Sequence, residues 1–254
     1  MYDLLNYPLV LFGLSFLILW FVTRLGATIR KGRLMDQNVR DDFGTILATT
    51  LTLSSLIIGF SFSMAINRYE QRKNYEEAEA NAIGTEYVRA DLLPPEDAAQ
   101  VRTLLRQYLD QRLSFYKVRN VGQLRQIEAR TAQLENDLWA AVRRSASTQP
   151  TPVVALAVAG MNDVLNSQGY TDAAWLNRIP AGAWFLMATI SLITQLLVGY
   201  GARNAKVEGT LFRVLPFVVS ISFLLIADID SPRSGIIHVI PQNLTILADE
   251  LRTP

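Results

Sequence analysis

The 254-residue sequence contains no cysteine and a single histidine, His238. Without cysteine the chain can form neither a disulfide nor a thiolate metal site, and one histidine argues against a multi-histidine metal centre or a Ser-His triad. The 24 Lys and Arg residues against 23 Asp and Glu residues give a net charge of +1, which provides no bulk attraction for nucleic acid. The composition therefore predicts no cofactor, no metal ion and no nucleic-acid partner.

Charged residues are also scarce, at 19% of the chain, and they are missing from long stretches of it. A helix needs about 20 apolar residues to cross the hydrocarbon core of a bilayer. Four segments meet this requirement, namely residues 4–22, 43–67, 179–202 and 209–227, the last of which carries only Arg213 near its start. Together they predict an all-α, multi-pass protein of the cell (inner) membrane whose spans contact the lipid bilayer.

The four spans divide the chain into successive parts. Residues 1–67 are expected to hold the first two spans, with the second helix continuing to about residue 93 because no helix-breaking residue precedes Pro94-Pro95. We predict a helical extramembrane domain over residues 68–178, two further spans over residues 179–229, and an ordered tail over residues 230–254.

Within residues 68–178, apolar residues at steps of three and four predict two helices that form an antiparallel hairpin. The first helix follows Pro95 and the second follows Gly122, and the positions of the two stripes are Val101, Leu104, Leu105, Tyr108, Leu109, Leu113 and Tyr116, then Leu124, Ile127, Thr131, Leu134, Leu138 and Val142. The composition SASTQPTP over residues 145–152 predicts a linker. A short helix over residues 153–165 and a segment over residues 170–177 are expected to lead into the third span.

Basic residues in short loops tend to remain in the cytoplasm. The connection between the first two spans carries Arg24, Arg30, Lys31, Arg33 and Arg40. By a small margin, this count favours placing both termini and the 68–178 domain outside the cytoplasm.

Polar residues recur along one side of the second span, at steps of three and four that align them on one helix face. With the apolar Leu56 and with Gly59 at the intervening steps, the set is Thr45, Thr49, Thr52, Leu56, Gly59, Ser63 and Asn67, and we call this set, together with Phe60, the polar stripe. A helix that lines water would use such a face, with Leu56 and Phe60 as a hydrophobic constriction. The alternative is that the hydroxyls bond their own backbone or pack against small residues. A pore would require a homo-oligomer, because one copy cannot enclose it.

The end of the second span carries Ile58-Gly59-Phe60, Ser63, Arg68, Tyr69, Glu70, Arg72 and Asn74. This segment resembles the bestrophin superfamily, which has a Gly-Phe pair in its pore helix followed by an Arg-aromatic pair and a further Arg and Asn. The likeness is closer to the bacterial bestrophin-like branch, through GFSFSMAINRYEQR at residues 59–72 and EEAEANAIGTEYVRADLLP at residues 76–94. Asp228-Ile229-Asp230-Ser231-Pro232 after the fourth span is a second similarity, and the order of spans and insert also agrees.

This resemblance implies a homopentameric ion channel in which the second helix of each subunit lines the axis. It places Leu56 and Phe60 near a narrow neck, with Thr52 one turn before them. Charged residues just beyond the membrane are candidates for the pore mouth or, alternatively, for a salt-bridged helix surface, and they are Arg68, Glu70, Arg72 and Lys73. The resemblance also implies a cytoplasmic insert, opposite to the side that the basic residues favour.

The similarity does not extend to the calcium site of animal members. Here Pro232 is followed by Arg233-Ser234-Gly235 rather than by a dense acidic run. Asp228 and Asp230 alone supply too few oxygens for calcium, which takes about six to eight. We therefore expect no calcium gating.

Two other functional classes compete with a channel. One is a membrane-anchored interaction or sensing module whose helical insert binds a partner. The other is an enzyme, but Glu76, Glu77, Glu79 and Glu86 are accompanied by no nucleophile–base pair or metal triad. Glu79 and Glu86 share a helix face that equally suits pairing with basic residues of a neighbouring helix. The sequence therefore predicts a protein that is not an enzyme.

Overall fold

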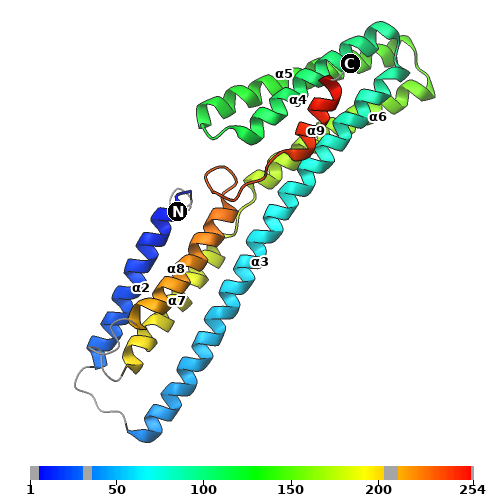
Figure 1. The fold of residues 1–254 in the computed structure, drawn as a ribbon. Coiled ribbons are helices and arrows are strands. Elements are labelled where there is room, and N and C mark those ends of the chain that lie inside the picture. The colour runs from blue at the N-terminus through cyan, green and yellow to red at the C-terminus, as the bar shows by residue number, and fades with distance from the viewer. Residues whose placement is uncertain (1–5, 31–35, 203–210, 253–254) are drawn as a thin grey trace. The chain divides into compact units, whose positions relative to one another are not determined.

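The computed structural model describes residues 6–30, 36–202 and 211–252, and within these ranges all regular structure is helical (Figure 1). The elements are α2 (Pro8–Arg30), α3 (Gln37–Arg89), η1 (Ala90–Leu92), α4 (Pro95–Lys117), α5 (Val121–Thr148), α6 (Pro152–Leu176), α7 (Ala181–Gly201), α8 (Leu211–Asp230) and α9 (Gln242–Arg252). The all-α prediction is confirmed.

Four helical stretches, which contain α2, α3, α7 and α8, are long and apolar enough to cross a membrane. This confirms the four-span prediction, although residues 4–5 and 209–210 of the predicted spans lie outside the described residues. The first span begins at Pro8, because proline suits the first turn of a helix, and it continues to Arg30. Arg24, Arg30 and Arg40, which we assigned to the loop between the first two spans, are helical instead.

The chain divides into two compact units. Met1–Arg68 and Arg178–His238 form the first, which we call the membrane unit, and Tyr69–Asn177 and Val239–Pro254 form the second, which we call the helical unit. The 53-residue helix α3 contributes to both. The tail that we predicted as one part is divided between them after His238.

In the membrane unit, α2 packs against α7 and α8 (Figure 1). Gly26 and Gly199 allow α2 and α7 to approach closely, since a Cβ atom at either position would collide with the Leu196 or the Thr23 carbonyl. The Thr23 hydroxyl donates a hydrogen bond to Gln195 Oε1 at 2.9 Å. Arg30 donates to the Tyr200, Gly201 and Ala202 carbonyls and so caps the end of α7.

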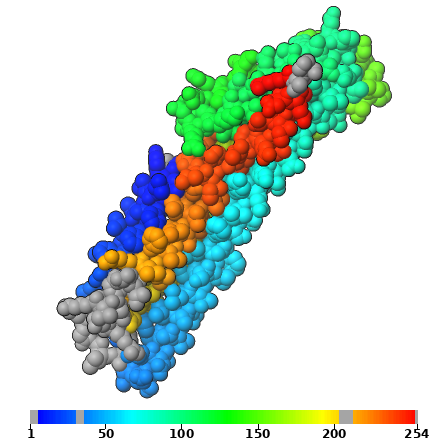
Figure 2. Space-filling view, in the orientation of Figure 1, coloured from blue at the N-terminus to red at the C-terminus, as the bar shows by residue number. Residues whose placement is uncertain are grey.

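The helical unit has a core formed by α4, α5, α6, α9 and the later part of α3. The apolar stripes that predicted the helical hairpin supply much of it, including Leu105, Leu109, Leu134 and Leu138, all at most 2% exposed. Figure 2 shows α9, in red, against the green helices of this unit. Burial of these side chains is the main force that holds the unit together.

Two details of the predicted insert were wrong. The linker covers only residues 149–151, because α5 continues to Thr148 and the Thr151 hydroxyl accepts from Val154 N at 3.2 Å to cap α6. The predicted break before residue 170 does not occur, and α6 is continuous from Pro152 to Leu176. Val164, Ser167 and Thr171 are buried at helical spacing there, so packing maintains the helix through Gly169.

Candidate functional site: the polar stripe of α3

All eight residues of the polar stripe are exposed in the single chain. They are Thr45, Thr49, Thr52, Leu56, Gly59, Phe60, Ser63 and Asn67. Leu56 is 50% exposed and Phe60 is 63% exposed, which is a large apolar surface for two neighbouring side chains. An ideal Cβ atom at Gly59 would meet no atom of the described residues within 4 Å. The stripe is therefore available for water, lipid or another subunit.

The stripe lies on the side of α3 away from its own chain. The buried residues of this part of α3 are Ser54, Ser61 and Ala65. Because each residue turns a helix by about 100°, the mean directions of the stripe and of these buried residues differ by about 170°. The subunit thus packs on one face of α3 and leaves the opposite, polar face uncovered.

The three threonine hydroxyls of the stripe bond to the helix itself. Thr45, Thr49 and Thr52 donate to the carbonyls of Asp41, Thr45 and Ala48 at 3.2, 2.9 and 2.9 Å. This is the local bonding that the alternative interpretation describes. It satisfies each hydroxyl hydrogen and leaves the exposed oxygen able to accept a hydrogen bond from water.

The four charged residues proposed for the pore mouth differ in their surroundings. Glu70 and Lys73 are exposed and Arg68 is half-buried. Arg72 is 1% exposed and donates to the Ala174 and Asn177 carbonyls, both at 3.2 Å, at the C-terminal end of α6. We therefore leave Arg72 out of the proposed pore mouth, because its guanidinium is committed to carbonyls within the helical unit.

The acidic residues of α3 in the helical unit are mostly structural. Glu79 forms a buried ion pair with Arg112 of α4 and accepts from Thr171 at 3.0 Å and from Tyr116 at 3.3 Å. Burial alone would lower the pKa of Arg112, but the adjacent Glu79 carboxylate raises it well above its usual value. Glu79 thus pairs with a neighbouring helix, whereas Glu77 is exposed.

Glu86 is fully buried, and neither of its carboxylate oxygens has a hydrogen-bond partner among the described residues. It lies against Gly160 of α6, where an added Cβ atom would collide with the carboxylate. Burial, opposed by Arg89 and assisted by Asp163, raises the pKa of Glu86 from 4.5 to about 8. The side chain is therefore protonated in the folded protein at neutral pH.

Glu86 is expected to make stability fall as the pH rises. The pKa of Glu86 is about 8 in the folded chain and 4.5 in the unfolded chain, so the folded chain binds this proton more tightly. The resulting stabilisation is complete below about pH 4.5 and is lost as the pH rises past 8. Between pH 6 and pH 9 the melting temperature should fall more for the wild type than for Glu86→Gln. Glu77→Gln replaces an exposed carboxylate, so its melting temperature should change with pH as that of the wild type does. If the melting temperature of Glu86→Gln changed with pH in the same way, the assignment of the raised pKa to Glu86 would be contradicted.

The acidic segment after α8 is used to position the chain. Asp228 accepts from the backbone N–H groups of Ile236 and Ile237, both at 2.8 Å, and Asp230 accepts from Ile179 N at 3.0 Å. These bonds hold the turn after α8 and the start of the third span. Among the described residues, no group of three His, Asp or Glu side chains is arranged to hold a metal ion.

Sequence reasoning missed Gln195, a fully buried amide in the third span. The signal was present, because Thr194-Gln195 is a polar pair inside an otherwise apolar stretch. Such residues in a membrane helix face the interior of the bundle and indicate a structural or binding role.

Comparisons with known proteins identify the family. The sequence matches the model of the bestrophin-like domain over residues 9–244. The fold is similar to crystal structures of a bacterial bestrophin homologue from Klebsiella pneumoniae. A tryptophan-to-alanine variant of that homologue has a TM-score of 0.62 at 12% identity, covering 96% of this chain and 95% of the other.

The structure of the same homologue solved by zinc phasing has a TM-score of 0.58 at 15% identity, with 95% and 98% of the two chains covered. No curated protein matches the sequence. At these identities the solved structures establish the fold, while the domain match covers most of the chain. The chain is therefore a membrane protein that belongs to the bestrophin-like family.

Proposed function

We propose that the chain forms an ion channel, assembled as a homopentamer, in which α3 of each subunit lines a central axis. The observation that carries this proposal is the exposure of all eight residues of the polar stripe on the side of α3 opposite its buried face. An uncovered face of hydroxyl groups gains little against lipid, whereas against water its oxygens can accept hydrogen bonds. Family membership and the order of spans support the same assembly.

In this proposal the hydroxyl oxygens of Thr45, Thr49 and Thr52 face water, and Leu56 and Phe60 form a hydrophobic neck. Both side chains project from α3 one turn apart and are at least half exposed. Rings of such residues narrow a pore and oppose its wetting. Arg68, Glu70 and Lys73 are the charged candidates at the pore mouth. We further propose an inner-membrane location with the helical unit outside the cytoplasm, as the basic residues favour.

Replacement of the neck residues tests the channel directly. Leu56→Ala and Phe60→Ala should each raise the single-channel conductance of purified protein in a planar bilayer, by roughly twofold or more, because a wider constriction is more easily wetted. The wild-type current under a potassium chloride gradient provides the reference and also gives the sign of the preferred ion.

The chain offers matched controls for this experiment. Leu186→Ala and Phe21→Ala remove side chains with the same exposures, 50% and 63%, from α7 and α2. They should leave the conductance unchanged. Equal effects of the neck and control variants would reject the neck, and no current from a verified oligomer under any gradient would reject the channel itself.

A further inference from the structure

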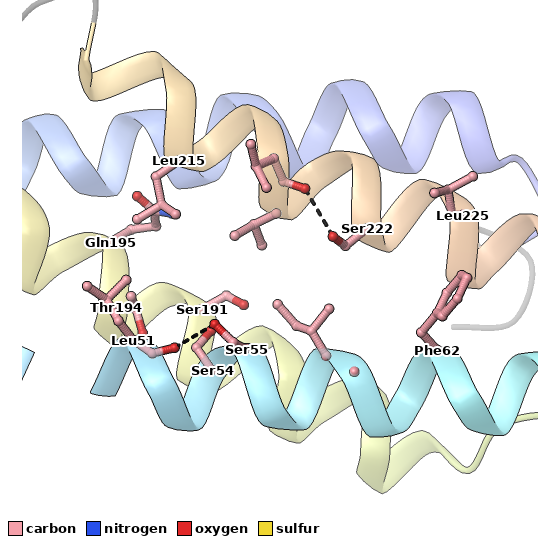
Figure 3. Close-up of a pocket in the computed structure, with 14 residues that line it drawn as sticks. Leu51, Ser54, Ser55, Phe62, Ser191, Thr194, Gln195, Leu215, Ser222 and Leu225 are labelled. Atoms are coloured by element: carbon pink, nitrogen blue, oxygen red, sulfur yellow. Dashed lines mark hydrogen bonds between the residues drawn. The ribbon is translucent and has the colours of Figure 1, made fainter. Parts of the chain in front are cut away.

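A cavity of about 420 Å³ lies within the membrane unit between α3, α7 and α8 (Figure 3). Its size falls in the range of about 300–1,000 Å³ that is typical of small-ligand sites. The walls combine exposed residues, such as Ser55 and Val218, with fully buried ones, Ser191 and Gln195. The cavity is thus open on one side and reaches the interior of the helix bundle on the other.

The interior wall carries unpaired hydrogen-bonding groups. Gln195 Oε1 accepts from Thr23, but Gln195 Nε2 has no partner among the described residues. The same is true of the Ser191 hydroxyl, one helical turn earlier on α7. Leaving a buried polar group unpaired is unfavourable. The cavity therefore favours an occupant that supplies a hydrogen-bond acceptor to Gln195 and Ser191.

The rest of the lining is mainly apolar and follows the helix axes. Leu51 and Leu215 lie at the Gln195 end, and Phe62 and Leu225 lie at the other end (Figure 3). The rise of an α-helix from Leu51 to Phe62 gives a length of about 16 Å. A charged group is expensive at this depth in a membrane protein, and the described lining contains no charged side chain to pair with one.

We propose that this cavity binds an uncharged, single-chain amphiphile from the bilayer. A carbonyl or hydroxyl oxygen of its head accepts from Gln195 and Ser191, and its hydrocarbon chain extends toward Phe62 and Leu225. On α3 the cavity residues are centred about 120° from the polar stripe. The site shares only Gly59 with the polar stripe and otherwise lies on another side of α3 from the proposed pore face, so binding can be tested whether or not the chain conducts.

Photolabelling of the full chain in phosphatidylcholine vesicles provides the test, with a monoacylglycerol carrying a diazirine in its acyl chain as the probe. Adducts mapped by mass spectrometry should concentrate on the α3 and α8 peptides that contain Phe62 and Leu225, and unlabelled monoacylglycerol should suppress them. Ser222→Phe, which fills the cavity, should reduce them at least about fivefold. Val214→Phe, on an exposed position of α8, should not.

A second variant keeps the proposal testable if Ser222→Phe does not fold. Ser191→Ala removes one hydrogen-bonding group with little change in side-chain volume. About fivefold more unlabelled monoacylglycerol should then be needed to halve the yield of adducts, as expected for one lost hydrogen bond. Adducts that the competitor does not suppress would indicate bulk lipid only and would overturn the proposal. If folded protein showed no adducts at the cavity, because water or a second copy of the chain fills it, the proposal would also be overturned.

Discussion

Glu79→Ala is expected to destabilise the helical unit by about 3–5 kcal/mol, because it removes the fully buried counter-ion of Arg112 and leaves only the partly exposed Asp172 carboxylate, at 3.4 Å, to pair with the guanidinium. Arg112 and Glu79 are 1% and 0% exposed, so water cannot replace the lost carboxylate. The same change removes the acceptor of the Thr171 and Tyr116 hydroxyls. Thermal unfolding of the full chain in detergent should show a melting temperature lower by roughly 10 °C or more.

The matched control is Glu77→Ala, two residues earlier on α3 and exposed. It should change the melting temperature by no more than about 2 °C. The double variant Glu79→Leu/Arg112→Leu should recover much of the loss, because an apolar pair of similar volume avoids the desolvation of two charges. Equal melting temperatures for Glu79→Ala and Glu77→Ala would show that the ion pair does not support the fold.

Gly199→Ala is expected to separate α2 from α7 and to destabilise the membrane unit by about 1–3 kcal/mol, the usual cost of overpacking. The added Cβ atom would collide with the Thr23 carbonyl, which is backbone and cannot rotate away as a side chain can. Gly26→Ala meets the Leu196 carbonyl in the same way, and the double variant should be worse than either. Small residues at such crossings let membrane helices pack closely.

At two other glycines, replacement by alanine is not expected to destabilise the protein. Gly13 on α2 and Gly182 on α7 have no atom of the described residues within 4 Å of an ideal Cβ atom. Alanine at either position should be neutral or stabilising by up to about 1 kcal/mol, because alanine favours the helix. Melting temperatures of the four single variants in detergent decide the matter, and a Gly199→Ala value equal to that of Gly182→Ala would contradict the close approach.

The fold could be predicted where the determining pattern is local. Uncharged stretches located the four spans, and apolar residues at steps of three and four located α4 and α5. The absence of a breaker before Pro94 predicted the length of α3, which ends at Arg89. Each of these signals lies within a few turns of one helix, so no knowledge of tertiary contacts is needed to use it.

The missed features depend on residues that are distant in the sequence. Arg72 lies in a run of charges typical of a solvated helix, and only its contact with the end of α6 shows that it is buried. Arg112 could not be assigned to Glu79, because nothing in the local pattern links residues 33 positions apart. Exposure of the polar stripe likewise depends on how α7 and α8 pack, which periodicity alone does not determine.

The helical unit is assembled from two distant parts of one chain. The Glu76 carboxylate accepts from Leu244 N at 2.9 Å and from Asn243 Nδ2 at 2.7 Å, and the first of these bonds spans 168 residues. During synthesis the acceptor is made first, and α7 and α8 must follow before its donors exist. The unit therefore cannot complete its folding as an independent early domain, because its final step must wait until α9 has been translated.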